Sequence, residues 1–120
     1  MPRTKTYRGR CHCGSVRFKF TSDEIKAGLR CNCSICIRKG AVMSAEFISP
    51  ERFNALEGTE ALSVYRFGDH DVNHYFCKRC GIYPFHDLTK KPGHYRVNLG
   101  CIDDIDSLAL VVSVVDGRSF

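Results

Sequence analysis

Apolar and polar residues alternate along several segments of the chain, which is the pattern of strands with one buried face. Val16, Phe18 and Phe20 alternate with polar residues, and a period of two places the apolar side chains on one face of a strand. No stretch shows the 3.6-residue period of a long amphipathic helix. We therefore predict a mainly β fold with about seven or eight strands. The predicted strand segments are 7–20 (the start of a strand pair), 41–47, 62–67, 72–76, 83–88, 95–99 and 108–115.

Two segments depart from this alternation. Residues 23–28 are expected to form a turn or a single helical turn. Residues 48–53 are expected to begin a helix, with Ser49 as its N-cap and Pro50 at its first position. Gly58 and Thr59 follow closely, so this helix is predicted to be short.

Three thiols lie within six residues of one another, at Cys31, Cys33 and Cys36. In a strand, Cys31 and Cys33 would share one face about 6.6 Å apart along the chain, and a turn would bring Cys36 back to them. A tetrahedral zinc ion needs sulfur atoms roughly 3.8 Å apart, so these side chains can share one metal. A structural zinc takes four protein ligands, whereas a catalytic zinc takes three and leaves one position open. The stretch therefore favours an open metal site.

Two further cysteine pairs have the spacing of metal half-sites. Cys11 and Cys13 share one face of the predicted strand, and Cys77 and Cys80 precede Gly81 as in a zinc knuckle. A thioredoxin-like motif would lead into a helix, but the chain continues through Pro84, so zinc is favoured over redox chemistry. Spacing alone leaves the partner of Cys77 and Cys80 open between Cys11/Cys13 and two of the three clustered thiols.

Composition is typical of a globular domain, because 43% of the 120 residues are hydrophobic. We expect one domain over residues 1–120. No apolar run approaches the roughly 20 residues that span a bilayer, and no apolar segment follows the basic N-terminus as in a secretory signal. A cytoplasmic location is therefore expected, where clustered thiols are metal ligands more often than disulfides.

The formal net charge of +5 is concentrated near the N-terminus. Arg3, Lys5, Arg8 and Arg10 lie in the first ten residues, which contain no acid, and the other basic residues nearly balance the 13 Asp and Glu residues. Residues 1–6 are expected to form a flexible arm. A basic face across the fold is the usual mark of a nucleic-acid partner, so this charge distribution does not predict one.

The cysteine motifs together resemble the glutathione-dependent formaldehyde-activating enzyme family, which includes the centromere protein V-like proteins. The resemblance spans residues 7–120 and implies an Mss4-like fold of antiparallel sheets around two zinc ions per chain. It also implies a structural zinc on Cys11, Cys13, Cys77 and Cys80, and a catalytic zinc on Cys31, Cys33 and Cys36. The motifs that carry it are Cys11-x-Cys13-Gly14-x-Val16, Cys31-x-Cys33-Ser34-x-Cys36 with Gly40, Phe76-Cys77-x-x-Cys80-Gly81, Asn98-x-Gly-Cys101-Ile102-Asp103 and Asp116-Gly117-Arg118.

The reaction implied by the resemblance is the addition of glutathione to formaldehyde, giving S-hydroxymethylglutathione, which is a carbon–sulfur lyase reaction in reverse. The implied partners are a small thiol and a small aldehyde, with no membrane. A three-thiolate zinc carries a net negative charge, so an anionic thiol needs nearby cations. Arg30, Arg38 and Lys39 are the candidates closest in sequence.

A second function class stays open, that of a non-catalytic zinc module that binds protein or nucleic acid. If Cys101, the eighth thiol, completed the three-cysteine site, that zinc would be closed and structural; we expect it instead to be a buried apolar residue. His12 lies on the face opposite Cys11 and Cys13, so it is expected at the surface or beside the metal ligands rather than as a ligand itself. The remaining histidines are expected at the surface, although any one of them could otherwise reach the open zinc or act as a proton carrier. These are His70, His74, His86 and His94.

Overall fold

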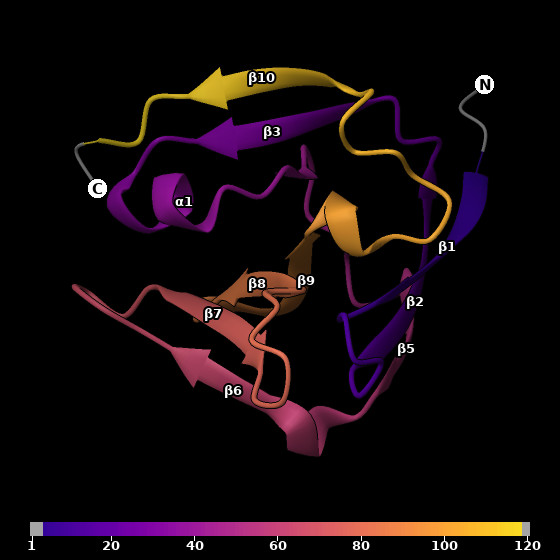
Figure 1. The fold of residues 1–120 in the computed structure, drawn as a ribbon, viewed down its shortest axis with the longest axis horizontal. Coiled ribbons are helices and arrows are strands. Elements are labelled where there is room, and N and C mark those ends of the chain that lie inside the picture. Colours follow the sequence, from indigo (N-terminus) through magenta and orange to yellow (C-terminus); the bar gives the residue numbers. More distant parts are fainter. Residues whose placement is uncertain (1–3, 119–120) are drawn as a thin grey trace.

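The computed structural model describes residues 4–118, and these residues form a mainly β fold with one short helix (Figure 1), which confirms the predicted fold class. None of its helices is long and apolar enough to cross a lipid bilayer. In chain order the elements are β1 (Thr4–Arg10), β2 (Arg17–Asp23), β3 (Ala27–Cys31), α1 (Ser34–Lys39), β4 (Met43–Ser44), β5 (Phe53–Glu57), the 3-10 turn η1 (Thr59–Ala61), β6 (Leu62–Tyr65), β7 (Val72–Cys77), β8 (Phe85–Leu88), β9 (Lys91–Val97), the 3-10 turn η2 (Leu99–Cys101) and β10 (Val111–Val115).

The strands form three small sheets around a shared core. Their orders are β1–β2–β5, β10–β3–β4 and β6–β7–β8–β9, and all pairs are antiparallel except β10 with β3. In Figure 1 the β1–β2–β5 sheet lies at the right, whereas α1 and β3 lie toward the upper left, with β6–β9 below them. Isolated bridges also tie loop residues to strands, as between Ile48, in the loop before β5, and Tyr95 of β9.

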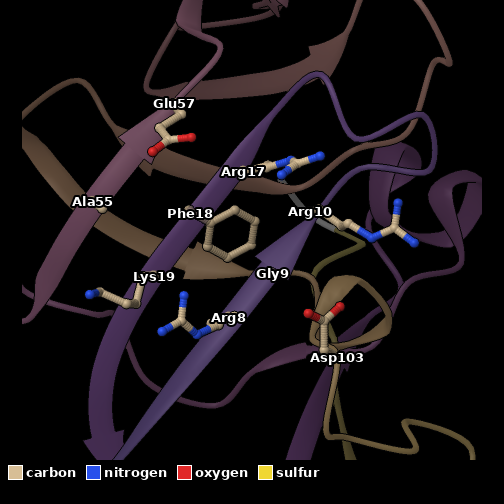
Figure 2. A pocket seen from close by; sticks show the side chains of 9 residues that line it. All are labelled: Arg8, Gly9, Arg10, Arg17, Phe18, Lys19, Ala55, Glu57 and Asp103. Atoms are coloured by element: carbon tan, nitrogen blue, oxygen red, sulfur yellow. The ribbon is translucent and has the colours of Figure 1, made fainter.

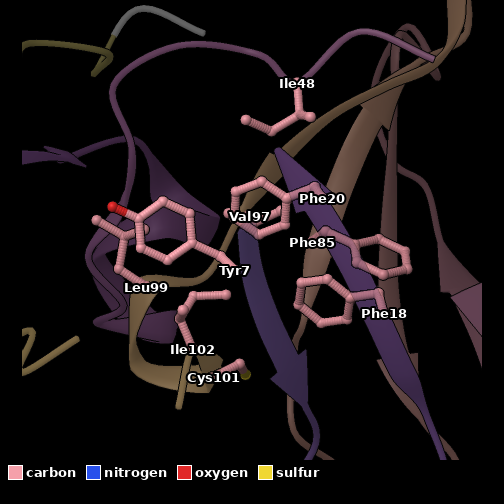
Figure 3. Close-up of a cluster of buried hydrophobic side chains, with 9 residues drawn as sticks. All are labelled: Tyr7, Phe18, Phe20, Ile48, Phe85, Val97, Leu99, Cys101 and Ile102. Atoms are coloured by element: carbon pink, nitrogen blue, oxygen red, sulfur yellow. The ribbon is translucent and has the colours of Figure 1, made fainter. Parts of the chain in front are cut away.

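Aromatic side chains from separate sheets fill the core between them (Figure 3). Phe18 and Phe20 point inward from β2, as the alternation predicts, and Phe18 meets Phe85 of β8 edge to face with ring centres 5.4 Å apart. Burying one such side chain stabilises the fold by about 1.5–3 kcal/mol. Gly9 is required beneath Phe18, because a Cβ at this position would lie 2.4 Å from the Phe18 ring.

The predicted helix start at residues 48–53 is wrong. The amides of Arg52 and Phe53 both donate to the Ser49 carbonyl, so the cap signal yields a single turn. The chain then extends as β5, because Phe53 and Leu56 pack against the aromatic core from an edge of the first sheet. Tertiary burial here outweighs local helix propensity.

Other element boundaries also differ from the sequence prediction. The strand predicted over 41–47 shortens to β4, and the segment 23–28 contains no helical turn, since β3 begins at Ala27. A flexible arm was predicted over residues 1–6, but Thr4–Thr6 pair instead with Thr21–Asp23 in the β1–β2 ladder. They do so because β2 extends as far as Asp23 and provides backbone partners for them. The rest of that arm lies outside the described residues.

Candidate metal centres and adjoining pocket

Four cysteines from two distant loops converge on one point. Cys11 and Cys13 lie in the loop between β1 and β2, whereas Cys77 ends β7 and Cys80 lies in the turn that follows. The sulfur of Cys13 is 3.7 Å from those of both Cys11 and Cys77, and all four sulfurs lie within 4.8 Å of one another. Tetrahedral Zn–S bonds of about 2.3 Å place sulfurs roughly 3.8 Å apart, so this cluster fits a closed zinc site.

Backbone geometry around this four-cysteine cluster supports thiolates. The amides of Val16 and Arg79 donate to the sulfurs of Cys11 and Cys77 at 3.3 and 3.4 Å. Gly81 has the expected positive φ of 78° and closes the turn by donating to the Cys77 carbonyl. The hydrogen bond with Ser15 lowers the pKa of Cys13 to about 6, whereas burial raises that of Cys77 to about 11. A bound cation would balance the buried thiolate at Cys77.

The second cluster contains three cysteines. Cys31 ends β3, Cys33 is the N-cap of α1 and Cys36 lies on α1 itself, so a helix rather than the expected turn returns Cys36 to the other two sulfurs. Their sulfurs lie within 4.8 Å of one another, and the Cys33 amide donates to the Cys31 sulfur at 3.4 Å. Gly40 ends the helix with φ of 70°. The three soft donors fit a zinc ion with one position left open.

The pKa values within this three-cysteine cluster diverge. Burial raises the pKa of Cys36 to about 12. At Cys33, burial acts in the same direction, but hydrogen bonds from the backbone and side chain of Cys36 outweigh it and the pKa is lowered. The Cys33 thiol therefore loses its proton more readily than a free cysteine does, whereas its buried neighbour Cys36 needs a cation nearby to lose its proton.

Cys101 does not complete the three-cysteine cluster. Its side chain, on η2, is 8% exposed and packs in the aromatic core (Figure 3). Burial raises its pKa to about 12, and the charged neighbours that contribute are Cys11 and Cys80 rather than the three clustered thiols. The open position of the three-cysteine cluster therefore has no eighth thiol to fill it.

A cavity of about 250 Å³ opens beside the three-cysteine cluster. Its walls come from α1, β3, β4, β7, β8, β9 and β10, and most of them are apolar, so a bound molecule would be largely shielded from water. Its lining residues are Leu29, Cys31, Cys33, Ile35, Cys36, Lys39, Ala41, Met43, Phe47, Phe67, Val72, His74, His86, Leu88, Arg96 and Val115.

Two buried histidines line this cavity and share one tyrosine. The Tyr83 hydroxyl lies 2.6 Å from Nδ1 of His74 and 2.9 Å from Nδ1 of His86. Burial lowers the pKa of His74 to about 4 and that of His86 to about 3, with Lys39 adding to both effects. Both rings are therefore neutral, so the hydroxyl donates to one Nδ1 and accepts from the other. One ring then offers an Nε2–H donor and the other an Nε2 acceptor.

Surface positions were predicted for the histidines, and this prediction is wrong for His74 and His86. His12 and His70 are exposed, as predicted, and His94 is half-buried. A signal for the buried pair existed in the sequence. The predicted strands 72–76 and 83–88 flank the Cys-x-x-Cys turn, and pairing them antiparallel places His74 opposite His86. Directly opposed residues share a face of the sheet.

Of the three cations expected beside the cluster, only Lys39 lines the cavity. Its Nζ lies 4.0 Å from the centre of the Tyr83 ring and has no hydrogen-bond partner among residues 4–118. Burial lowers its pKa. Arg30 and Arg38 are exposed, and their guanidinium groups donate to the carbonyls of Gly40 and Ser34.

The second cation of the cavity is Arg96, which sequence reasoning missed because it lies on β9, far along the chain. Its guanidinium carbon lies 4.4 Å from the Phe47 ring centre, and Nη2 donates to the Ala45 carbonyl. Its Nε is buried without a partner in the described chain. Lys39 and Arg96 thus both bring positive charge to the wall of this cavity, and each has a buried donor without a partner in the described chain.

Acidification is expected to destabilise the protein through His74 and His86. In the unfolded chain both titrate near pH 6.5, but in the folded protein their pKa values are about 4 and about 3. Between these values the unfolded chain binds more protons, so the unfolding free energy falls as pH drops below about 6.5. From about pH 7.5 to about pH 5.5, each histidine should cost roughly 1 kcal/mol.

Urea unfolding of His74→Phe measures this effect against wild type. Phenylalanine suits the site, because the ring of Phe67 stacks on His74 at 5.7 Å, and the variant should lose about 1 kcal/mol less on acidification. His70→Asn is the matched control, since Asn tolerates the positive φ of that exposed position. Equal acid sensitivity in all three proteins would contradict the buried neutral histidine.

Comparison with known proteins places this architecture among characterised families. A crystal structure of a Rhodobacter sphaeroides protein is similar, with 31% sequence identity, a TM-score of 0.76, and a match covering 90% of this chain and 99% of that chain. The family model described as glutathione-dependent formaldehyde-activating enzyme matches residues 6–115. With two cysteine clusters suited to metal ions on a mainly β fold, the chain belongs to the glutathione-dependent formaldehyde-activating enzyme family.

Proposed function

We propose that this protein is a zinc-dependent enzyme of the carbon–sulfur lyase type, which adds a small thiol such as glutathione to formaldehyde or a related aldehyde. In this proposal Cys31, Cys33 and Cys36 hold a catalytic zinc, and Cys11, Cys13, Cys77 and Cys80 hold a structural one. The observation that carries it is the three-cysteine cluster in the wall of an apolar cavity that also contains two cations and two neutral histidines.

Zinc at the open site would hold the substrate sulfur as a thiolate or polarise the aldehyde oxygen. Three thiolates already outweigh the charge of one zinc ion, so a second anion entering the cavity needs compensation. Lys39 and Arg96 provide it, because their side chains are held by Tyr83 and Phe47 with free donors. Charge-assisted hydrogen bonds from these groups would position a carboxylate-bearing thiol.

His74, Tyr83 and His86 would move the proton that the addition transfers from sulfur to oxygen. The Nε2 acceptor of one ring takes the thiol proton, while the Nε2–H of the other gives a proton to the aldehyde oxygen. The Tyr83 hydroxyl passes a proton between the two Nδ1 atoms, so the tautomers exchange and no net charge remains on the rings. Because burial disfavours an imidazolium, these transfers are concerted.

Removing either cavity cation is expected to weaken thiol binding. Lys39→Met and Arg96→Met each delete a charged donor while keeping much of the apolar stem, and KM for glutathione should rise about tenfold. Arg38→Met is the matched control, since Arg38 lies on the same helix as Lys39 but is exposed. Steady-state kinetics in both directions measure the effect. An unchanged KM in both cavity variants, or an equal rise in Arg38→Met, would contradict the assigned binding role.

Tyr83→Phe tests the proton path separately. It keeps the ring that supports Lys39 but removes the hydroxyl between the histidines, so kcat should fall by about 10²-fold or more with KM nearly unchanged. A Tyr83→Phe variant with full kcat would contradict the proposed proton transfer through the Tyr83 hydroxyl, but it would not bear on the binding roles of Lys39 and Arg96.

The alternative of a non-catalytic zinc module makes the opposite prediction for the metal. A four-sulfur site completed by Cys101, or a contiguous basic face, would favour this alternative, and the position of Cys101 in the core argues against the first of these. An enzyme is therefore the better supported reading of this site.

A further inference from the structure

The outward face of the β1–β2 hairpin carries four cations in two directly opposed pairs. Arg8 lies opposite Lys19, and Arg10 lies opposite Arg17; Figure 2 shows all four around a shallow groove. They share this face because the residues between them, Gly9 and Phe18, are buried on the core side. Like charges directly opposite one another destabilise an antiparallel pair, so each of these pairs carries a cost that the β1–β2 ladder itself does not offset.

Two carboxylates compensate these four cations only in part, and one of them, Glu57, lies directly opposite Arg17 in the β2–β5 ladder. The groove has a volume of about 470 Å³, and Glu57 and Asp103 are its acidic lining residues. Figure 2 shows these two carboxylates at opposite sides of the groove, and the ion pairs within residues 4–118 all involve other residues. The groove therefore keeps a net positive charge.

The four cations divide into two with a structural role and two without one. Arg10 donates to the His12 carbonyl and Arg17 to the Gly14 carbonyl, so both brace the loop that carries Cys11 and Cys13. Arg8 and Lys19 make no side-chain hydrogen bond or ion pair in the described part of the chain. Their charges remain available to a ligand.

We propose that this hairpin face binds the phosphate backbone of duplex nucleic acid, a property that goes beyond the proposed enzyme activity. Rows of guanidinium and ammonium groups are the groups that contact phosphates without reading sequence. The groove lining contains no exposed aromatic side chain, and binding of single strands relies on such rings to stack bases. Stable attachment to a membrane also needs exposed apolar groups, and the exposed large hydrophobic residues lie outside this groove.

This face and the three-cysteine cavity lie on separate parts of the fold. The cations belong to the β1–β2–β5 sheet, at the right in Figure 1, whereas the cavity is lined from α1 and the other two sheets. Nucleic acid on the hairpin would therefore leave the cavity open, so both activities can coexist. This surface is not evident from the sequence, because Arg8 and Arg10 count there as part of an N-terminal charge excess, and only the pairing of β1 with β2 places them beside Arg17 and Lys19.

Fluorescence anisotropy with a labelled DNA duplex of about 20 base pairs tests the proposal on the zinc-loaded protein. Two phosphate contacts from Arg8 and Lys19, or up to four if Arg10 and Arg17 also reach phosphates, predict that log K falls against log salt with a slope between about −2 and −4. Arg8→Glu with Lys19→Glu should reduce that slope by about 2 and weaken binding at least about tenfold at low salt. Lys90→Glu with Lys91→Glu is the matched control, because it makes the same charge change at exposed residues outside the groove.

A gain of affinity provides a readout that misfolding cannot imitate. Glu57→Gln removes one carboxylate from the groove and should tighten duplex binding about two- to threefold. The proposal is overturned if wild type does not bind the duplex at low salt, or if the Lys90/Lys91 variant loses as much affinity as the Arg8/Lys19 variant. Binding to phosphatidylserine vesicles without binding to the duplex would equally overturn it, in favour of a membrane surface.

Discussion

Replacing Cys77 by serine is expected to leave the chain largely unfolded in the absence of denaturant. Cys77 is fully buried within the four-cysteine cluster. A structural zinc contributes roughly 10–16 kcal/mol to a small domain, which is as large as the whole stability of about 5–15 kcal/mol that such domains retain. Far-ultraviolet circular dichroism and zinc content of the purified variant measure the outcome.

Cys101→Ala is the control for this variant, because Cys101 is also buried but belongs to neither cluster. Its loss should cost only the packing of one small side chain, about 1 kcal/mol. Treatment of wild type with a strong zinc chelator should reproduce the unfolding of Cys77→Ser. A folded, zinc-free Cys77→Ser protein would show that the four-cysteine cluster does not hold the fold together.

Cys36→Ser is expected to abolish the proposed activity while leaving the protein folded. In the proposed function Cys36 supplies one of three ligands at the open site, and even residues that only support metal ligands cost about 10–100-fold when replaced. A loss above about 100-fold is therefore expected, together with loss of one zinc ion per chain. The measurement is the rate of exchange between isotopically labelled formaldehyde and its glutathione adduct, followed by nuclear magnetic resonance.

Ile37→Ser is the matched control on the same short helix, because Ile37 is 60% exposed and points away from the cluster's cavity. It should keep both zinc ions and the activity. Full activity in Cys36→Ser would place the chemistry elsewhere, whereas equal loss in both variants would indicate damage to α1 rather than to a metal site.

Sequence alternation was sufficient for the strands that bury one face fully. Phe18 and Phe20 were predicted on the core side and lie there, and the hairpin of β6 and β7 follows the predicted segments. The sequence pattern did not predict β5. The cap signal at Ser49 forms one turn, and the burial of Phe53 then favours an extended strand over a helix. Local propensity cannot report a contact with distant residues.

Helix α1 was missed although its end was signalled. Six residues are too few to show a helical period, and Cys33 makes no side-chain hydrogen bond as N-cap. The basic last turn, Arg38 and Lys39, followed by Gly40 in the left-handed conformation is nevertheless the usual end of a helix. Reading that signal backward from Gly40 would have placed Cys36 on a helix.

The sequence predicted the cysteines of the candidate site but not the cavity beside them. Cysteine spacing predicted metal half-sites, yet it left their pairing open; the grouping in the structure is the one that the family resemblance implied. His86 and Arg96 could not be placed from spacing, because strand pairing across the β8–β9 hairpin brings them to the cavity. Arg30 and Arg38 were predicted as cations of the site because they lie close to the cysteines in sequence, but both are exposed and neither lines the cavity.

Zinc-edge X-ray absorption with metal content per chain tests the central claim most directly, on wild type and on Cys101→Ser. The account predicts two zinc ions, one with four sulfur neighbours and one with three sulfurs and an oxygen or nitrogen, and the same spectrum in both proteins. Two sites with four sulfurs each, one of them lost in Cys101→Ser, would contradict an open catalytic zinc and make this protein a structural zinc module.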